Sequence, residues 1–330
     1  MNQVKNNNPL LKKARRKYLA NGIKYQLGQV LSSPLHKSYI KSFCCSRCLI
    51  QTDNRLMGIY CNQRWCPTCT AIKTAKFIDA YKHELEQHQD YYFVTLTIKS
   101  DQIYAENLKE KIGEMILAWK RINANARDKK RTGQELIWHG MRKIECTYRD
   151  NGTFHPHFHV LVRGEAVAER IITEWLNHFP TSLRSCQTMP KADAGIQHEL
   201  FKYYTKLISG SSKNKKSRKV NPVALDAVLQ AMIGRRVFHN FGTFKKKLDE
   251  TELGTLEQQE FEIEERPMIW NWVQKNHDWI DLETGECLSG YNPSDTFTEI
   301  AYPNGSNILD FSEGEKSNHY SGRAQALLDK

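Results

Sequence analysis

Three histidines alternate with other residues in one short segment, and their side chains are well suited to binding a cation. The segment reads His155-Pro156-His157-Phe158-His159. Successive side chains of a β-strand point to opposite faces, so His157 and His159 share a face, and His155 has the same parity. Two imidazoles at this spacing can hold one divalent ion, with His155 as a possible third contributor. The alternative is a set of sheet histidines hydrogen-bonded to their neighbours, but three alternating histidines favour a metal.

A carboxylate in the preceding segment is a candidate third ligand for the same ion. Glu145 lies in the sequence KIECTY, which we predict to pair with the histidine strand through a turn at 150–152. Glu145 faces the histidines only if the loop has an odd number of residues, as in a three-residue turn with a bulge. A mixed imidazole and carboxylate set leaves positions open for water and a phosphate oxygen, as Lewis-acid chemistry requires.

Two adjacent tyrosines in the sequence HELFKYYTK are candidate nucleophiles on a predicted helix. Glu199 and Tyr203 are four residues apart, as are Lys202 and Lys206, so each pair shares a helix face. A tyrosine oxygen can attack phosphorus, a carboxylate can activate water, and the lysines can contact phosphates. Tyrosines on amphipathic helices mostly serve packing, and Tyr203 and Tyr204 are equivalent on chemistry alone.

Closely spaced cysteines indicate a zinc site upstream of these segments. Cys45 and Cys48 form one CxxC pair, and Cys66 and Cys69 form a second. Two such turns can complete a four-sulfur structural zinc site, with Cys61 as a rival for one position of the first pair. The polar residues around them argue against buried free thiols.

Hydrophobic periodicity indicates an α+β fold, in which a central antiparallel β-sheet carries helices on its faces. We predict strands over 91–100, 140–150 and 153–164, and helices over 71–88, 105–127, 167–178, 196–208 and 223–234. We divide the chain into a basic N-terminal arm (1–42), a zinc-binding cysteine-rich element (43–70), a main domain (71–250) and an acidic C-terminal extension (251–330). A dispensable appendage is the simplest interpretation of that extension.

The charge distribution favours a polyanionic partner. Residues 251–330 hold 16 acidic and 5 basic residues, which leaves 43 basic and 21 acidic residues in the first 250. A basic body of this kind is typical of nucleic-acid-binding proteins, and Arg64 and Lys73 beside the cysteines are candidate phosphate contacts. The sequence has no membrane-spanning apolar run and no signal-peptide pattern, so we expect a cytoplasmic protein that does not bind membranes.

Taken in order, these segments resemble the rolling-circle plasmid replication initiators of the HUH endonuclease superfamily, specifically the group with a single tyrosine and a partner glutamate. The resemblance covers roughly residues 44–248. Its motifs are FVTLTI at 93–98, HPHFHVLV at 155–162, Glu199-x-x-Lys202-Tyr203-x-x-Lys206, the cysteine element from Cys61 to Cys69, and Arg235-Arg236 followed by Phe241-Gly242-x-Phe244-Lys245.

The resemblance implies an HUH/RRM-like nuclease core and a role for each motif. His157 and His159 would bind Mg²⁺ or Mn²⁺, and Glu145 as a third ligand remains an inference from the hairpin. The tyrosine at position 203 would attack the scissile phosphate and keep the 5′ end as a phosphotyrosyl ester, while the freed 3′-OH primes a host polymerase. Glu199 would activate water at termination, and Lys206 would contact a phosphate.

The implied substrate is plasmid origin DNA, exposed as a single strand or hairpin. The sequence has no GxxxxGK[ST] phosphate loop, so a host helicase would have to open the duplex. A transposase or relaxase with the same chemistry is one alternative. A non-enzymatic zinc-dependent DNA-binding regulator is another, although it leaves the histidines and the Glu199–Tyr203 pair unexplained.

Overall fold

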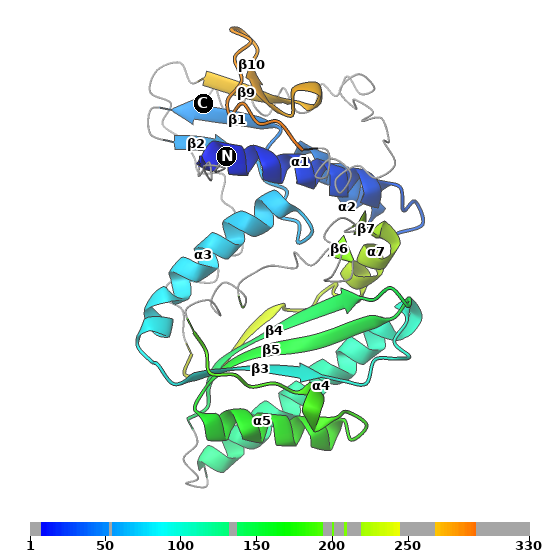
Figure 1. Ribbon diagram of the computed structural model, residues 1–330, viewed down its shortest axis with the longest axis vertical. Helices are drawn as coiled ribbons and strands as arrows, with labels where there is room; N and C mark the ends of the chain where they lie inside the picture. Colours follow the sequence, from blue (N-terminus) through cyan, green and yellow to red (C-terminus); the bar gives the residue numbers. More distant parts are fainter. Residues whose placement is uncertain are drawn as a thin grey trace, which may run out of the picture.

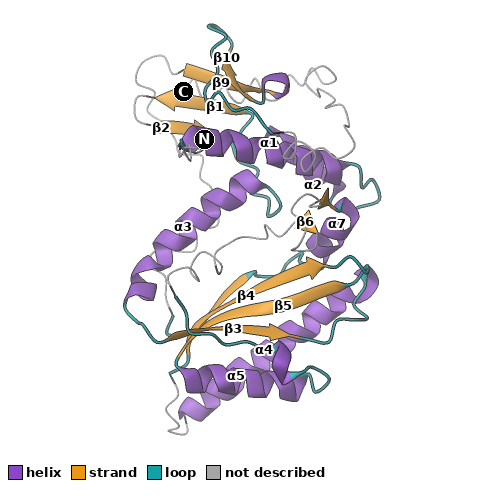
Figure 2. Cartoon of the chain, in the orientation of Figure 1, coloured by secondary structure: helices purple, strands orange, loops and turns teal. Residues whose placement is uncertain are grey.

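The computed structural model describes residues 8–52, 55–131, 137–193, 200, 208–209, 219–244 and 268–294. These residues form an α+β structure with antiparallel sheets, as the sequence predicts (Figures 1 and 2). The helices are α1 (Pro9–Gly28), α2 (His36–Lys41), α3 (Pro67–Glu86), α4 (Ala105–Arg131), α5 (Glu165–His178) and α7 (Pro222–Ala231). The strands are β1 (Cys48–Thr52), β2 (Arg55–Gly58), β3 (Tyr91–Thr97), β4 (His139–Tyr148), β5 (Phe154–Arg163), β6 (Ile208–Ser209), β7 (Lys219–Val220), β8 (Phe238–Gly242), β9 (Met268–Val273) and β10 (Asp278–Asp281).

The central sheet has the strand order β3-β5-β4-β8 and is antiparallel throughout. Strand β5, which carries the three histidines, lies between β3 and β4 and is therefore paired on both sides. Strand β8 extends the edge beside β4, and the sequence pattern did not predict it. Its five residues, FHNFG, are too short for alternation to distinguish a strand from a loop.

The turn between β4 and β5 sets the register on which the predicted carboxylate ligand depends. Arg149 N donates to Thr153 O at 2.9 Å, and Gly152 N donates to Arg149 O at 3.0 Å. Gly152 has φ +84°, a left-handed conformation that glycine adopts without a steric penalty. The result is a three-residue turn, 150–152, which meets the condition that the loop has an odd number of residues. Glu145 therefore lies directly opposite His157.

One face of the central sheet packs against α4 and α5, which lie together beneath it in Figure 1. Phe158 and Val160 of β5 point to this face and are fully buried. Trp119 of α4 contacts Phe158 with ring centroids 6.2 Å apart, and Trp175 of α5 contacts it at 5.3 Å. The helical periodicity predicted over 105–127 and 167–178 is confirmed, because its apolar positions form this core.

The opposite face carries the histidines and a second, smaller core. Phe93 and Leu161 pack there against Tyr81 of α3 and against Leu200. Because side chains alternate along β5, His157 and His159 share this face with Leu161. Helix α3 crosses above this face in Figure 1 and begins one residue after Cys66.

A second sheet, with the order β10-β9-β1-β2, joins the cysteine-rich element to the acidic extension. Leu49 of β1 lies opposite Trp270 of β9. Trp279 of β10 is fully buried and donates its indole N–H to Ser46 O at 2.8 Å. Residues 268–281 therefore complete the sheet of the cysteine-rich element and are not a separate appendage. The two segments are more than 200 positions apart, so no local pattern could reveal their pairing.

The basic arm is an integral part of the fold. Helix α1 buries Tyr18, Ile23 and Leu27, and it packs against α3 and α7. Asp226 of α7 is buried and accepts hydrogen bonds from the hydroxyls of Ser33 and Tyr39. These contacts attach the arm to α7.

Most of the helix predicted over 196–208 lies outside the described residues. Leu200 is helical and fully buried, and Ile208–Ser209 form strand β6, which pairs with β7. Among the described helices, none combines the length and the apolar character needed to cross a bilayer.

Candidate active site and metal centres

Glu145, His157 and His159 converge on one face of the central sheet. The Nε2 atoms of His157 and His159 each lie 3.5 Å from Oε2 of Glu145. One ligand atom from each of the three residues lies within 4.8 Å of the others, which suits a single cation. The predicted trio is therefore assembled by the pairing of β4 with β5, in the register that the three-residue turn sets.

The protonation of Glu145 and His159 suits metal binding. Burial alone would raise the pKa of Glu145, but the adjacent imidazoles of His157 and His159 and the charge of Lys143 outweigh it. The pKa of this carboxyl therefore lies well below its usual range, and the group is ionised. Burial lowers the pKa of His159, which favours the neutral imidazole that binds metals. Lys143 is fully buried and forms an ion pair with Glu145.

Two further observations show that the histidine nitrogens are oriented for a cation. Nδ1 of His157 lies 3.0 Å from the carbonyl of His155, so it carries the proton and leaves the Nε2 lone pair free. Nε2 of His159 is buried and has no hydrogen bond of good geometry within the described part of the chain. A buried polar atom without a partner is costly, and a divalent ion between His159 and Glu145 would satisfy it. The donor set therefore fits a divalent metal.

His155 shares this face and lies beside the trio. Its ring stacks on that of His157 at a centroid distance of 5.2 Å, and its Nδ1 lies 2.8 Å from the Ser100 hydroxyl. It does not belong to the group of ligand atoms that converge, so it is an outer neighbour of the site.

The predicted catalytic residues Tyr203, Glu199 and Lys206 lie outside the described residues. Leu200, which belongs to the same segment, is described and packs in the small core beside Phe93 and Leu161. Phe93 also stacks on the ring of His159 with centroids 5.0 Å apart. The segment therefore reaches the histidine-bearing face at Leu200.

A second group of metal-ligating side chains consists of Cys45, Cys61, Cys66 and Cys69. Their sulfurs are close together: Cys45 to Cys66 is 3.6 Å, Cys45 to Cys69 is 3.4 Å, and Cys61 to Cys69 is 3.6 Å. Sulfurs bound tetrahedrally to zinc at ~2.3 Å lie roughly 3.8 Å apart, so this spacing suits a zinc tetrathiolate.

Cys48, the remaining predicted zinc ligand, lies apart from this group. It begins β1, and its thiol donates to Oδ1 of Asn271 in β9 at 2.9 Å. Strand pairing thus directs Cys48 toward the acidic extension, and Cys61 joins the tetrad in its place. Cys45, Cys66 and Cys69 are also fully buried, contrary to the expectation drawn from their polar neighbours.

Two buried lysines of α1 lie beside the tetrad, and one of them, Lys24, supports a negative charge on it. Four thiolates around Zn²⁺ carry a net charge of −2. Lys17 is buried and donates from Nζ to Cys45 O at 2.6 Å. Nζ of Lys24 is buried with no hydrogen-bond partner in the described part of the chain. Burial lowers the pKa of Lys24, but the cysteine thiolates outweigh this and raise it. A buried unpaired ammonium is costly, and a zinc tetrathiolate beside it would balance the charge.

The predicted phosphate contacts beside the cysteines have internal partners. Arg64 donates from Nη1 to Met232 O at 3.0 Å, and Lys73 donates to Asn62 O at 3.2 Å. These bonds connect the cysteine loop to the end of α7 and to the start of α3.

The sequence did not predict a third group, Glu84, His88 and His139, whose ligand atoms also lie within 4.8 Å of one another. Glu84 and His88 lie four residues apart at the end of α3, which is a local signal that could have been noticed. His139 is separated from them by about 50 positions, and only the pairing of β4 in the sheet brings it close.

Comparison with protein-family models gives a match to the family described as Replication protein, over residues 55–279. The match includes the histidine hairpin, the tyrosine segment and three of the four clustered cysteines. The chain belongs to this family of replication proteins. Membership supports a role in starting plasmid replication. The match extends through β9 and ends within β10, beyond the C-terminal limit that the motifs had suggested. No curated protein and no solved structure gives a significant match to the chain.

Proposed function

We propose that this protein initiates rolling-circle replication of a small plasmid by nicking one strand of its origin DNA. The observation that carries the proposal is the convergence of Glu145, His157 and His159 on the sheet face to which Leu200 packs. Leu200 lies three residues from Tyr203 in the sequence. A tyrosine transesterase of the HUH type requires a cation-binding trio and a phenol within reach of it, and the proposal assigns the phenol to Tyr203.

Catalysis is proposed to proceed by two transesterification steps and one hydrolysis. His157, His159 and Glu145 would hold Mg²⁺ or Mn²⁺, which neutralises charge that builds on the nonbridging phosphate oxygens. The Tyr203 oxygen attacks phosphorus, the bond to the 3′ oxygen breaks, and that oxygen takes up a proton. The 5′ end stays on the protein as a phosphotyrosyl ester, and a host polymerase extends the 3′-OH.

Termination is assigned to Glu199, with Lys206 as a phosphate contact. After a full round of copying, a water molecule deprotonated by Glu199 hydrolyses the regenerated origin phosphodiester and releases a new 3′-OH. This 3′-OH attacks the phosphotyrosyl ester, which closes the displaced strand and frees Tyr203. Origin DNA exposed as a single strand or hairpin is the proposed substrate, and a host helicase would separate the duplex. The zinc tetrad is proposed to be structural.

The nicking of supercoiled plasmid that carries the cognate origin tests this proposal. With Mg²⁺ or Mn²⁺, we expect an open-circular product with protein on its 5′ end. Tyr203→Phe should reduce nicking by roughly 10³-fold or more, because the nucleophile is removed. Tyr204→Phe is the matched control and should nick at a rate close to that of the wild type.

Two outcomes would contradict the assignment. An active Tyr203→Phe would reject this nucleophile, and sequence-specific binding without any nicking would favour a DNA-binding regulator. Glu199→Ala should still nick but should accumulate the covalent protein–DNA adduct. Normal release in that variant would remove the role given to Glu199.

A further inference from the structure

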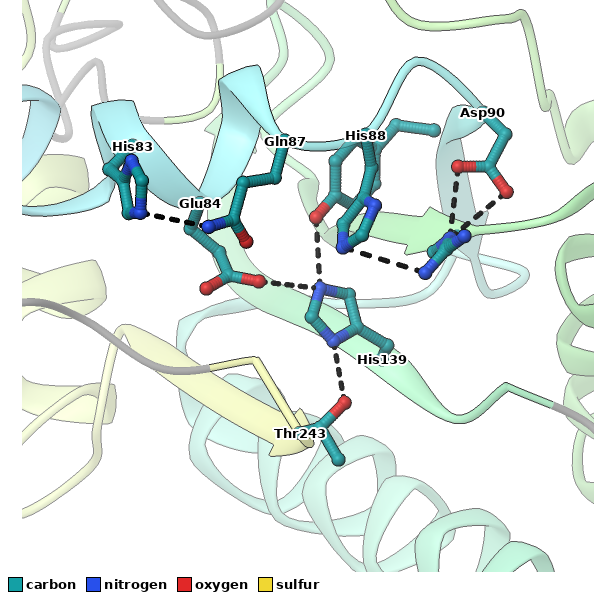
Figure 3. A network of polar contacts seen from close by, with 9 residues as sticks. His83, Glu84, Gln87, His88, Asp90, His139 and Thr243 are labelled. Atoms are coloured by element: carbon teal, nitrogen blue, oxygen red, sulfur yellow. Dashed lines mark hydrogen bonds and ion pairs between the residues drawn. The ribbon is translucent and has the colours of Figure 1, made fainter.

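A group of polar side chains lies at the other end of the histidine-bearing face, between helix α3 and the sheet. Glu84 lies in the last turn of α3, and His88 follows the helix after one intervening residue. His139 is the first residue of β4 and is buried. Figure 3 shows Glu84 and His88 directed toward His139 from the helix end.

The three residues offer converging ligand atoms. Nε2 of His139 lies 3.0 Å from Oε1 of Glu84, and the ring centroids of His88 and His139 are 5.5 Å apart. The Tyr91 hydroxyl lies 2.9 Å from the same nitrogen of His139. Nε2 of His139 thus faces two oxygen atoms. A metal ion bound to this nitrogen would lie close to both the Glu84 carboxylate and the Tyr91 hydroxyl.

The surrounding contacts orient the imidazoles for a metal. Nδ1 of His139 lies 2.8 Å from the hydroxyl of Thr243. This hydroxyl can accept a hydrogen bond from a protonated Nδ1, which leaves Nε2 free to act as a ligand. Metal-bound histidines typically donate their second nitrogen in this way. Nε2 of His88 lies 3.5 Å from the guanidinium of Arg163. That distance is at the limit for a hydrogen bond, so the contact is weak.

The charges around the group permit a cation. The guanidinium of Arg163 lies beside His88, and its Nε forms an ion pair with both carboxylate oxygens of Asp90 at 3.0 and 3.1 Å. Glu84 then supplies a negative charge that has no lysine or arginine within ion-pair distance among the described residues.

We propose that Glu84, His88 and His139 form a further metal site, which binds Zn²⁺ through two imidazoles and one carboxylate. This ligand set is typical of four-coordinate zinc with one open position, which water or the Tyr91 hydroxyl can fill. The site is separate from the proposed catalytic site, because His139 and Glu145 lie six residues apart along β4, or about 20 Å.

Together, the zinc tetrad and the proposed site would anchor both ends of α3. Cys66 is the N-cap of α3 and Cys69 lies in its first turn, so the zinc tetrad anchors the start of the helix. The proposed site anchors its end to β4, about 30 Å away along a helix of 20 residues. Two metals would then fix the angle between the cysteine element and the central sheet.

Zinc titration of the full-length protein tests the proposal. The background protein for the titration carries His157→Gln and His159→Gln, and its cysteine tetrad is already loaded with zinc. A colorimetric chelator serves as the competitor. We expect about one further equivalent of Zn²⁺ per chain, which His88→Gln abolishes. Zinc should also raise the Tm of the background protein but not that of the His88→Gln variant.

His83→Gln is the matched control, because His83 lies on the same helical turn and its Nε2 contacts the Gln87 amide at 2.8 Å rather than a proposed ligand. It should bind zinc as the background protein does. Glu84→Gln keeps an acceptor for His139 while removing the charge, and it should also lose the zinc. Equal zinc binding by His88→Gln and His83→Gln would overturn the proposal, as would a background protein that binds no further equivalent.

Discussion

At the scale of single residues, Cys48 and Cys61 differ in what their thiols contact. The thiol of Cys61 lies 3.6 Å from that of Cys69, and the thiol of Cys48 donates to the side chain of Asn271. By spacing alone, either cysteine could complete the tetrad. The direction in which β1 leaves the Cys45 loop decides between them.

This difference gives a prediction about zinc content. Cys61→Ser should lose bound zinc and several kcal/mol of folding free energy, because metal binding is coupled to folding at such sites. Cys48→Ser should retain one zinc per tetrad and cost only about 1 kcal/mol, the net contribution of a hydrogen bond. Metal analysis combined with denaturant unfolding measures both effects. If Cys48→Ser lost the zinc and Cys61→Ser kept it, the tetrad would instead consist of the two CxxC pairs.

At the scale of elements, the close approach of β8 to β4 depends on one glycine. Gly242 has φ +64°, and a Cβ atom built there would lie 1.4 Å from Trp138 O. The contacting atom is backbone, so it cannot move aside without separating the two strands. Gly242 therefore fixes the edge of the central sheet.

Substitution of Gly242 should lower the free energy of unfolding by more than the cost of placing an alanine at positive φ. Gly234→Ala tests the conformational cost, because Gly234 has φ +69° with no heavy atom within 4 Å of the built Cβ. It should cost about 1–2 kcal/mol. Gly242→Ala should cost at least about 3 kcal/mol, since strand separation is added to the conformational cost. Urea unfolding compares the two variants, and equal costs would show that β8 shifts freely.

At the scale of the whole molecule, strands from the early and late parts of the chain meet in one sheet. Strand β9 pairs with β1 and β10 pairs with β9, and Trp279 is buried against Trp272 with ring centroids 4.9 Å apart. The indole N–H of Trp279 also holds Ser46, the residue after the zinc ligand Cys45. The acidic extension therefore supports the cysteine loop directly.

Removal of this tryptophan should weaken both the fold and zinc retention. Trp279→Ala is expected to lower the free energy of unfolding by about 3–5 kcal/mol, the usual cost of deleting a buried aromatic side chain. It should also release zinc to a chelator faster than the wild type does. Leu282→Ala is the control, because Leu282 is 70% exposed and lies just beyond the same strand. Unchanged zinc release in Trp279→Ala would separate the extension from the cysteine loop.

The sequence by itself determined the features that depend on short-range periodicity. The alternation of His157 and His159 placed them on one face and made Glu145 a candidate ligand for a turn of odd length, and the structure supplied that length. The apolar positions of α4 and α5 likewise predicted the face that they cover. These features follow from the period of a strand or helix, which is a property of neighbouring residues.

Only the tertiary structure decided the features that depend on distant pairing. The choice of Cys61 over Cys48, the union of β9 with β1, and the meeting of His139 with Glu84 and His88 all join segments through strand order and helix packing. Register in a sheet is set by cross-strand contacts, and a local sequence pattern does not contain the identity of the partner strand. The sequence thus predicted the chemistry of individual ligands, and long-range packing decided which of them meet.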